Sequence, residues 1–210
     1  MEPTLALVAC GPQLEVGLCA GHLAAASVVR LAGPTPRSSL LLAAVDLVVD
    51  DAGLGPGDIA HVVVGRGPGS FTGIRSALAT AEGLRAATGV TVSAYDSLTM
   101  QAARCLVEGD VWTAQPGRRG EVYARRFAIS PDRPPRPHGD VEVLAVGDLA
   151  GREPWVAAEA LDLEGARRAA AVVTAAEALL RLVGWGVSVD PVEPLYIEGP
   201  PIHRPRGGHR

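Results

Sequence analysis

The chain has 210 residues, of which 48% are hydrophobic, and it carries a formal net charge of -4. This length suits one large domain or two small lobes, and the apolar content is enough to build a core. The negative charge argues against a protein that holds nucleic acid unaided, because such proteins usually carry a basic surplus that neutralises phosphates.

Three short strand-like runs open the chain. They are predicted at Thr4–Cys10, Leu14–Ala20 and Ala24–Leu31. The turn signal Gly11-Pro12 separates the first two, which favours a meander of neighbouring strands at the start of a sheet.

A strongly apolar helix is predicted next, at about Ser38–Ala52. Ser38 or Ser39 can cap its first turn by accepting a hydrogen bond from a backbone N–H group. Because apolar residues cover much of its surface, this helix is expected to be either buried or part of an interface.

Strands and helices alternate in the following segment. Such alternation implies parallel strand pairing and an α/β fold. Caps are expected at Gly89, at the end of the second helix, and at Asp96 or Ser97, before the third. The predicted elements are a strand at Asp58–Gly65, a helix at about Thr72–Ala87, a strand at Val90–Tyr95 and a helix to about Val107.

The second half of the chain is less regular. The proline-rich stretch Ser130–Gly139 is predicted to be a loop. The segment 199–210 is basic and rich in proline and glycine, so it is expected to be a disordered, solvated tail, with an arm that touches RNA as the alternative. The predicted elements are strands at Asp110–Gln115, Glu121–Ile129, Asp140–Val146 and Trp155–Ala158 and a helix at Ala169–Val183.

A glycine-rich loop, Gly65–Arg75, stands between a predicted strand and a predicted helix. Gly67 and Gly69 permit backbone angles that other residues avoid, and Ser70 or Thr72 can cap the helix that follows. Free N–H groups at a helix start favour an anion. The residues alone leave open a phosphate or carboxylate cradle, a rigid contact surface and a tight turn without a ligand.

Three kinds of site are disfavoured. Cys10, Cys19 and Cys105 form no CxxC pair and the histidines are scattered, so neither a disulfide framework nor a metal site is expected. Ser70 lacks the glycine two positions later that a nucleophile elbow requires, since Thr72 stands there. The glycine loop also differs from the P-loop and from the Rossmann fingerprint.

No targeting or membrane segment is predicted. The N-terminal residues lack a basic region followed by an apolar stretch, and no apolar run approaches the roughly 20 residues that span a bilayer. We therefore expect a cytoplasmic protein without membrane association.

The glycine loop also carries a resemblance to a known family. The stretches VVVGRGPGSFTGIR and ALATAEGLRAATGV resemble the signature of the TsaB (YeaZ) family. Weaker matches follow in order at Ser97-Leu98, at RRGEVY beginning with Arg118, and at Pro194-Leu195-Tyr196. The resemblance therefore spans nearly the whole chain.

This resemblance implies a fold. Family members have the ASKHA (actin/Hsp70/sugar-kinase-like) fold, a duplicated two-lobe α/β fold with mixed sheets. The second lobe of this chain is short and irregular, which indicates a degenerate copy. The expected division is an N-terminal lobe at 1–107, a smaller C-terminal lobe at 108–198 and the tail at 199–210.

The resemblance also implies a function. The family supplies a non-catalytic subunit to the complex that makes N6-threonylcarbamoyladenosine next to the anticodon of tRNA. It implies binding to the catalytic paralogue TsaD and association with the ATPase TsaE, contact with tRNA only through the complex, and a possible homodimer when the chain is alone. It implies no cofactor of the chain's own, and any ATP or ADP at the interface with TsaD. The alternative is a free-standing ASKHA phosphotransferase or hydrolase.

Two departures from the family pattern affect chemistry. Where the family has an acid and hydroxyls at the first phosphate turn, this chain has Ala9-Cys10-Gly11-Pro12. Nothing in that turn can hold Mg²⁺ or orient a water, which disfavours the alternative. An acidic residue is also missing from the segment Gln115–Arg118.

The family meets its partners through the helices after the first strands and after the glycine loop. We expect no catalytic residue. The candidates for anion or nucleotide contact at the interface are Gly69, Ser70, Arg75 and Arg118. The residues predicted to face a partner are Leu41, Leu42, Val45, Val48, Ile74 and Leu78.

Overall fold

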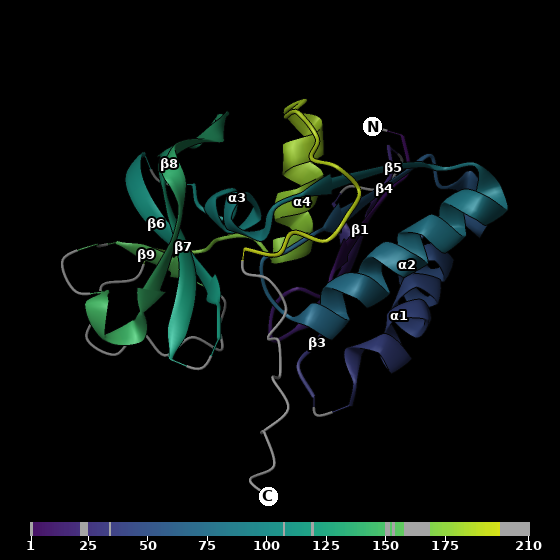
Figure 1. Ribbon diagram of the computed structural model, residues 1–210. Coiled ribbons are helices and arrows are strands. Elements are labelled where there is room, and N and C mark those ends of the chain that lie inside the picture. Colours follow the sequence, from purple (N-terminus) through teal and green to yellow (C-terminus); the bar gives the residue numbers. More distant parts are fainter. Residues whose placement is uncertain are drawn as a thin grey trace, which may run out of the picture.

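The computed structural model describes residues 2–21, 25–33, 35–106, 108–118, 120–149, 152, 154–157 and 169–197. Within these ranges the chain forms a five-stranded sheet and a four-stranded sheet, with a short helix, α3 (Ser97–Ala102), between them (Figure 1). The predicted tail at 199–210 lies outside the described residues.

The first sheet has the strand order β3-β2-β1-β4-β5. β1, β2 and β3 form the expected meander, and they pair in antiparallel fashion. β1, β4 and β5 are parallel, as the alternation of strands and helices predicts. The strands span Thr4–Val8, Leu14–Cys19, Ser27–Leu31, His61–Gly65 and Thr91–Tyr95.

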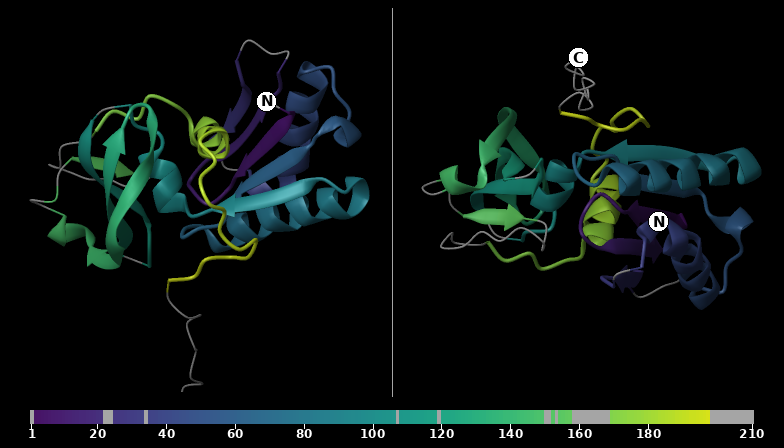
Figure 2. Two further views of the ribbon diagram at one scale, coloured as in Figure 1. Left: turned by 90° about the horizontal axis from the view of Figure 1, so that it is seen from above. Right: turned by 60° about the horizontal axis from the view of Figure 1, so that its bottom comes forward.

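Helices cover both faces of this sheet. α1 (Arg37–Asp51) and α2 (Phe71–Thr88) lie side by side on one face, and α4 (Ala175–Gly184) lies on the other (Figures 1 and 2). β1 is buried along its whole length, because it lies in the middle of these three layers. The main core of the protein is therefore built around β1 and β4.

The second sheet has the order β8-β7-β6-β9. β6 and β7 form the antiparallel pair expected from the sequence, whereas β6 and β9 are parallel. Leu98 and Ala102 of α3 pack against Val111 and Phe127 of this sheet. The strands span Gly109–Pro116, Glu121–Ser130, Arg133–Ala145 and Trp155–Ala157.

The proline-rich stretch is not the predicted loop. Arg133–Ala145 forms β8, so most of Ser130–Gly139 belongs to a strand. Among the described strands β8 lies at the edge of the sheet and pairs with β7, and its register shifts along the way. Proline lacks an N–H group, and an edge strand tolerates this because one side of it makes no ladder hydrogen bonds.

Two helix starts differ from the prediction. α1 spans Arg37–Asp51 with Pro36 at its N-cap position, so it begins before the predicted caps Ser38 and Ser39. α4 begins at Ala175 and not at Ala169, because Thr174 forms a capping box with Glu177. The Thr174 hydroxyl accepts from the Glu177 N–H at 3.1 Å, and the Glu177 carboxylate accepts from the Thr174 N–H at 2.8 Å.

The remaining boundaries are closer to the sequence-based expectation. Gly89 ends α2 in the left-handed conformation, and Asp96 caps α3 by accepting from two N–H groups. α3 itself stops at Ala102, short of the predicted end near Val107, which lies outside the described residues. A short 3-10 turn occupies Pro56–Asp58, so β4 starts only at His61.

Candidate functional site

The glycine loop is pressed against the turn that follows β1. A Cβ atom built on Gly69 would lie 2.1 Å from the carbonyl oxygen of Cys10, and one on Gly73 would lie 1.9 Å from that of Ala9. No side chain fits at either distance. The glycine loop and the turn after β1 are therefore in direct backbone contact.

Two N–H groups of this loop donate hydrogen bonds to acceptors within the chain. The Ser70 N–H donates to the Cys10 carbonyl at 2.7 Å, and the Gly73 N–H donates to the Ser70 hydroxyl at 3.3 Å. Ser70 is thus the cap of α2, one of the two residues that the sequence offered. Oxygens of the chain itself therefore occupy the positions that an anion would need at the Ser70 and Gly73 N–H groups.

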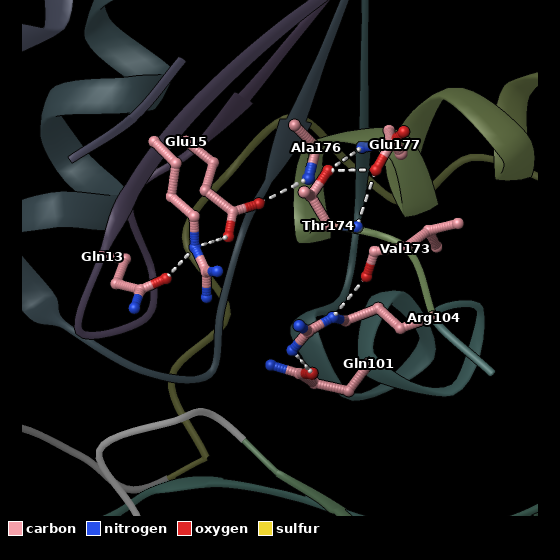
Figure 3. A network of polar contacts seen from close by, with 9 residues as sticks. Gln13, Glu15, Gln101, Arg104, Val173, Thr174, Ala176 and Glu177 are labelled. Atoms are coloured by element: carbon pink, nitrogen blue, oxygen red, sulfur yellow. Dashed lines mark hydrogen bonds and ion pairs between the residues drawn. The ribbon is translucent and has the colours of Figure 1, made fainter. Parts of the chain in front are cut away.

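The space beside the Ala9–Pro12 turn is small. A cavity of about 20 Å³ is lined by residues that include Gly11, Glu15, Arg30 and Arg104. This volume suits about one ordered water and is far below the roughly 300–1,000 Å³ of a small-molecule site. Figure 3 shows polar contacts of two of these residues, Glu15 with Ala176 and Arg104 with Gln101 and Val173.

The C-terminal closing segment, residues 190–197, is tied to the glycine loop. The Leu195 N–H donates to the Arg66 carbonyl at 2.9 Å, and the Arg66 Nε donates to the Glu193 carbonyl at 2.9 Å. Arg66 also lies 3.8 Å from the Asp190 carboxylate. Arg66 is buried, so it holds two parts of the chain together and does not face solvent.

Asp190 marks the start of this closing segment. Its carboxylate accepts from the Asp96 N–H at 2.8 Å. Burial raises the pKa of the Asp190 carboxyl above its ordinary value and the nearby charge of Asp96 adds to the rise, whereas the hydrogen bond and Arg66 oppose it. The arrangement joins the segment to α3 and presents no nucleophile.

Three side chains, of which only Arg75 was a predicted site residue, meet at the start of α2 in an exposed cluster. The Arg75 guanidinium lies 3.9 Å from the centroid of the Phe71 ring, and its Nε donates to the Tyr196 hydroxyl at 2.9 Å. The Phe71 and Tyr196 rings stack with centroids 5.4 Å apart. The sequence singled out Arg75 but missed both rings, because Tyr196 comes from the far end of the chain.

Arg118, the fourth candidate for anion contact, lies elsewhere. It is exposed in the turn between β6 and β7, where its carbonyl accepts from the Glu121 N–H at 2.9 Å. It therefore belongs to the second sheet, whereas Gly69, Ser70 and Arg75 belong to the first.

The predicted partner surface needs a correction. Leu41, Val45, Val48, Ile74 and Leu78 are buried in the core of the chain itself, so they add little exposed surface to a partner interface. Of the predicted residues only Leu42 is exposed, at 60%, and Leu47, which the sequence did not single out, is exposed at 58%. A cavity of about 90 Å³ opens beside Leu42 and is lined by Val49, Pro56 and Leu84 among others.

The buried thiols are not nucleophiles. Burial raises the pKa of Cys10 to about 11, and burial likewise raises the pKa of Cys105 to about 11. We expect iodoacetamide at pH 8 to alkylate Cys19, which is partly exposed, well before the other two, with all three reacting after unfolding in urea. Peptide mass spectrometry measures this order, and rapid labelling of Cys10 in the folded protein would contradict the buried position.

Within the described ranges, no group of three or more His, Cys, Asp or Glu side chains is placed to hold a metal ion. None of the helices in the same ranges is long and apolar enough to cross a membrane.

Sequence comparisons relate the chain to proteins of tRNA modification. Residues 37–133 match the family described as TsaD, tRNA N6-adenosine threonylcarbamoyltransferase. An uncharacterized protein of Mycobacterium tuberculosis is 33% identical over 156 residues, which are 71% of this chain and 69% of that protein. The tRNA threonylcarbamoyladenosine biosynthesis protein TsaB of Bacillus subtilis is 35% identical over 81 residues, 38% of this chain and 35% of that protein.

Comparison with solved structures agrees with the sequence comparisons. YeaZ from Pseudomonas aeruginosa superimposes with a TM-score of 0.76 at 26% identity, over 94% of this chain and 100% of that one. A second Pseudomonas aeruginosa structure, described as similar to peptidase YEAZ, gives the same TM-score at 25% identity, over 94% of this chain and 100% of that one. The expected α/β fold of ASKHA type with two mixed sheets is thereby confirmed.

Proposed function

Because the chain belongs to the YeaZ (TsaB) family, we propose that it serves in the synthesis of N6-threonylcarbamoyladenosine on tRNA as an accessory subunit. In this role it binds a catalytic subunit of the TsaD type, and the transfer of the threonylcarbamoyl group takes place on that partner. Any nucleotide of the complex then lies at the interface of the two subunits.

The outer face of α1 carries this proposal. The inner face of the helix packs into the core, yet Leu42 and Leu47 stand on the opposite side, exposed at 60% and 58%. Ala43 lies between them and is exposed as well. Apolar surface of this kind is characteristic of an interaction site, since its burial is worth about 25 cal/mol per Å².

The surroundings of these leucines suit a helical partner. α2 runs alongside α1, so a partner can pack against both helices at once (Figure 1). The cavity of about 90 Å³ beside Leu42 can accept an apolar side chain. Asp46 and Asp50 lie at its margin and provide the polar rim that is typical of protein interfaces.

The closed glycine loop fits an accessory role. Its N–H groups at Ser70 and Gly73 are satisfied within the chain, and the neighbouring turn offers no carboxylate. Turnover of ATP by the purified chain alone, at a rate above that of a sample without protein, would contradict this part of the proposal.

We expect Leu42→Asp to weaken binding of a TsaD-type protein from the same organism by at least about 10-fold, because a charge would be buried without a partner at the interface. The fold should persist, since Leu42 is mostly exposed. Isothermal titration with the two purified subunits measures the affinity, and circular dichroism checks the fold.

Leu106→Asp is the matched control, because Leu106 is also an exposed leucine but follows α3 on another part of the surface. Its affinity should equal that of the unaltered chain. Val45→Asp is unsuitable, since Val45 is buried and its replacement would unfold the protein. Equal affinities for Leu42→Asp and Leu106→Asp would remove α1 from the interface.

A further inference from the structure

We infer that this chain contacts single-stranded RNA directly, through the exposed cluster of Phe71, Arg75 and Tyr196. The inference rests on the proposed function, because it makes the tRNA substrate a ligand of this subunit as well as of its partner. The expectation from family resemblance was the opposite, namely that tRNA is reached only through the complex.

The cluster offers two aromatic faces to solvent. Phe71 is exposed at 51% and Tyr196 at 41%, and both lie outside the hydrophobic core. The rings form a stacked platform with their planes 28° apart, so a base would extend this stack from a ring face that neither the other ring nor Arg75 covers. An unstacked base can lie on such a platform whatever its identity, because every base has a π-face.

Arg75 adds a fixed positive charge to the platform. Its guanidinium lies against Phe71, and its Nε bonds to Tyr196. Among the described residues no carboxylate forms an ion pair with Arg75, so its charge is available to a phosphate. A guanidinium held against an aromatic ring binds phosphate with less loss of side-chain entropy than a free arginine.

The platform is assembled before any ligand arrives. Tyr196 is placed by the closing segment, where Leu195 bonds to the Arg66 backbone at 2.9 Å. The Leu195 carbonyl also lies only 3.0 Å from the position of a Cβ on Gly67, so the segment is packed tightly onto the glycine loop. A preformed site avoids the ordering cost that weakens many binding surfaces.

Charge and shape favour RNA over a protein partner at this cluster. The sequence after Tyr196, residues 197–210, contains three arginines and one glutamate, so its side chains carry a net positive charge. The outer face of α1 is different, since its leucines are flanked by Asp46 and Asp50, which repel phosphate. The ligand must be single-stranded, because bases within a duplex are already stacked and paired.

The test uses the full chain and a fluorescein-labelled RNA hairpin with a seven-nucleotide single-stranded loop (about the size of an anticodon loop, and within the site size of ordinary single-strand binders). Fluorescence anisotropy gives the Kd. We expect saturable binding that Tyr196→Leu and Arg75→Gln each weaken by about 10-fold. Arg75→Gln should also lower the slope of log K against log salt by about one, which Tyr196→Leu should not.

Arg85→Gln is the matched control, because it removes the same charge from the exposed far end of α2. It should change the Kd by less than about twofold. Any of three results would overturn the inference: no binding up to millimolar RNA, equal binding by all variants, or equal affinity for a blunt RNA duplex.

A fourth outcome would assign the cluster to a protein. If Tyr196→Leu and Arg75→Gln lost affinity for the TsaD-type subunit but kept their affinity for RNA, the platform would be a protein contact and the inference would be wrong. The RNA measurement uses the chain alone, so it can fail while Leu42→Asp still weakens binding of the TsaD-type subunit. The two proposals are thereby tested separately.

Discussion

Gly73→Ala is expected to lower the free energy of unfolding by about 3 kcal/mol or more, which is at the upper end for overpacking. The methyl group would lie 1.9 Å from the Ala9 carbonyl oxygen and 2.9 Å from its carbon. Both are backbone atoms, so either α2 or the turn after β1 must move. Such a shift also breaks the hydrogen bond from the Ser70 N–H to Cys10.

The matched control is expected to change the free energy of unfolding in the opposite direction. Gly83 lies in the same helix, and a Cβ built there meets no atom within 4 Å. Gly83→Ala should therefore raise the free energy of unfolding by about 0.5–1 kcal/mol, since alanine is the better helix former. Urea unfolding followed by circular dichroism measures both variants, and stabilisation by Gly73→Ala would show that the loop is not pressed against the turn.

The local properties of this loop could be read from the sequence, but its closure could not. The sequence identified Ser70 as one of two possible caps and placed the start of α2 to within one residue. The contact that closes the loop joins Gly69 and Gly73 to Cys10 and Ala9, some sixty residues earlier in the chain. A local sequence motif does not predict a contact between segments so far apart in the chain. The anion cradle therefore stayed open as an alternative in the sequence-based prediction.

The partner surface shows a similar limit. α1 is apolar on most sides, and apolar content alone does not say which side the sheet will cover. The structure covers Leu41, Val45 and Val48 and leaves Leu42 and Leu47 outside. The prediction that this helix is buried or part of an interface holds for its inner face, and the interface itself stays a proposal.

Two errors in element boundaries have different causes. The start of α4 was readable, because Thr174 and Glu177 have the spacing of a capping box, but the alanine-rich residues before it favoured an earlier start. The strand β8, in contrast, could not be predicted from a local motif. Its prolines predict a loop unless the strand lies at the edge of a sheet, and only the tertiary fold decides that position.

Glu15 is the buried carboxylate that joins the first sheet to α4. It lies on β2, where it accepts from the Ala176 N–H at 2.9 Å and pairs with the Arg30 Nε at 3.2 Å (Figure 3). A negative charge at this position is also favourable because it faces the positive end of the α4 dipole. Glu15 therefore orients α4 against the sheet by direct contact with its first turn.

We expect Glu15→Ala to lower the free energy of unfolding by about 2–4 kcal/mol, because the Ala176 N–H would stay buried without an acceptor and Arg30 would lose its carboxylate. Glu15→Gln should cost about 1–2 kcal/mol, since the amide oxygen can still accept the hydrogen bond. Glu142→Ala, which breaks a partly exposed pair with Arg152, is the control and should cost less than about 1 kcal/mol.

Urea unfolding measures the change in the free energy of unfolding for each of the three variants. Hydrogen exchange shows which part of the fold is destabilised. If Glu15 holds α4 in place, its loss should speed exchange of the amides at Ala176 and Ala178 more than that of the β4 amides, because the helix would open before the sheet. Uniform acceleration over both elements would mean that Glu15 stabilises the whole fold without a special role for α4. A cost equal to that of Glu142→Ala would mean that the contact with Ala176 contributes little, and that α4 is held by its apolar face alone.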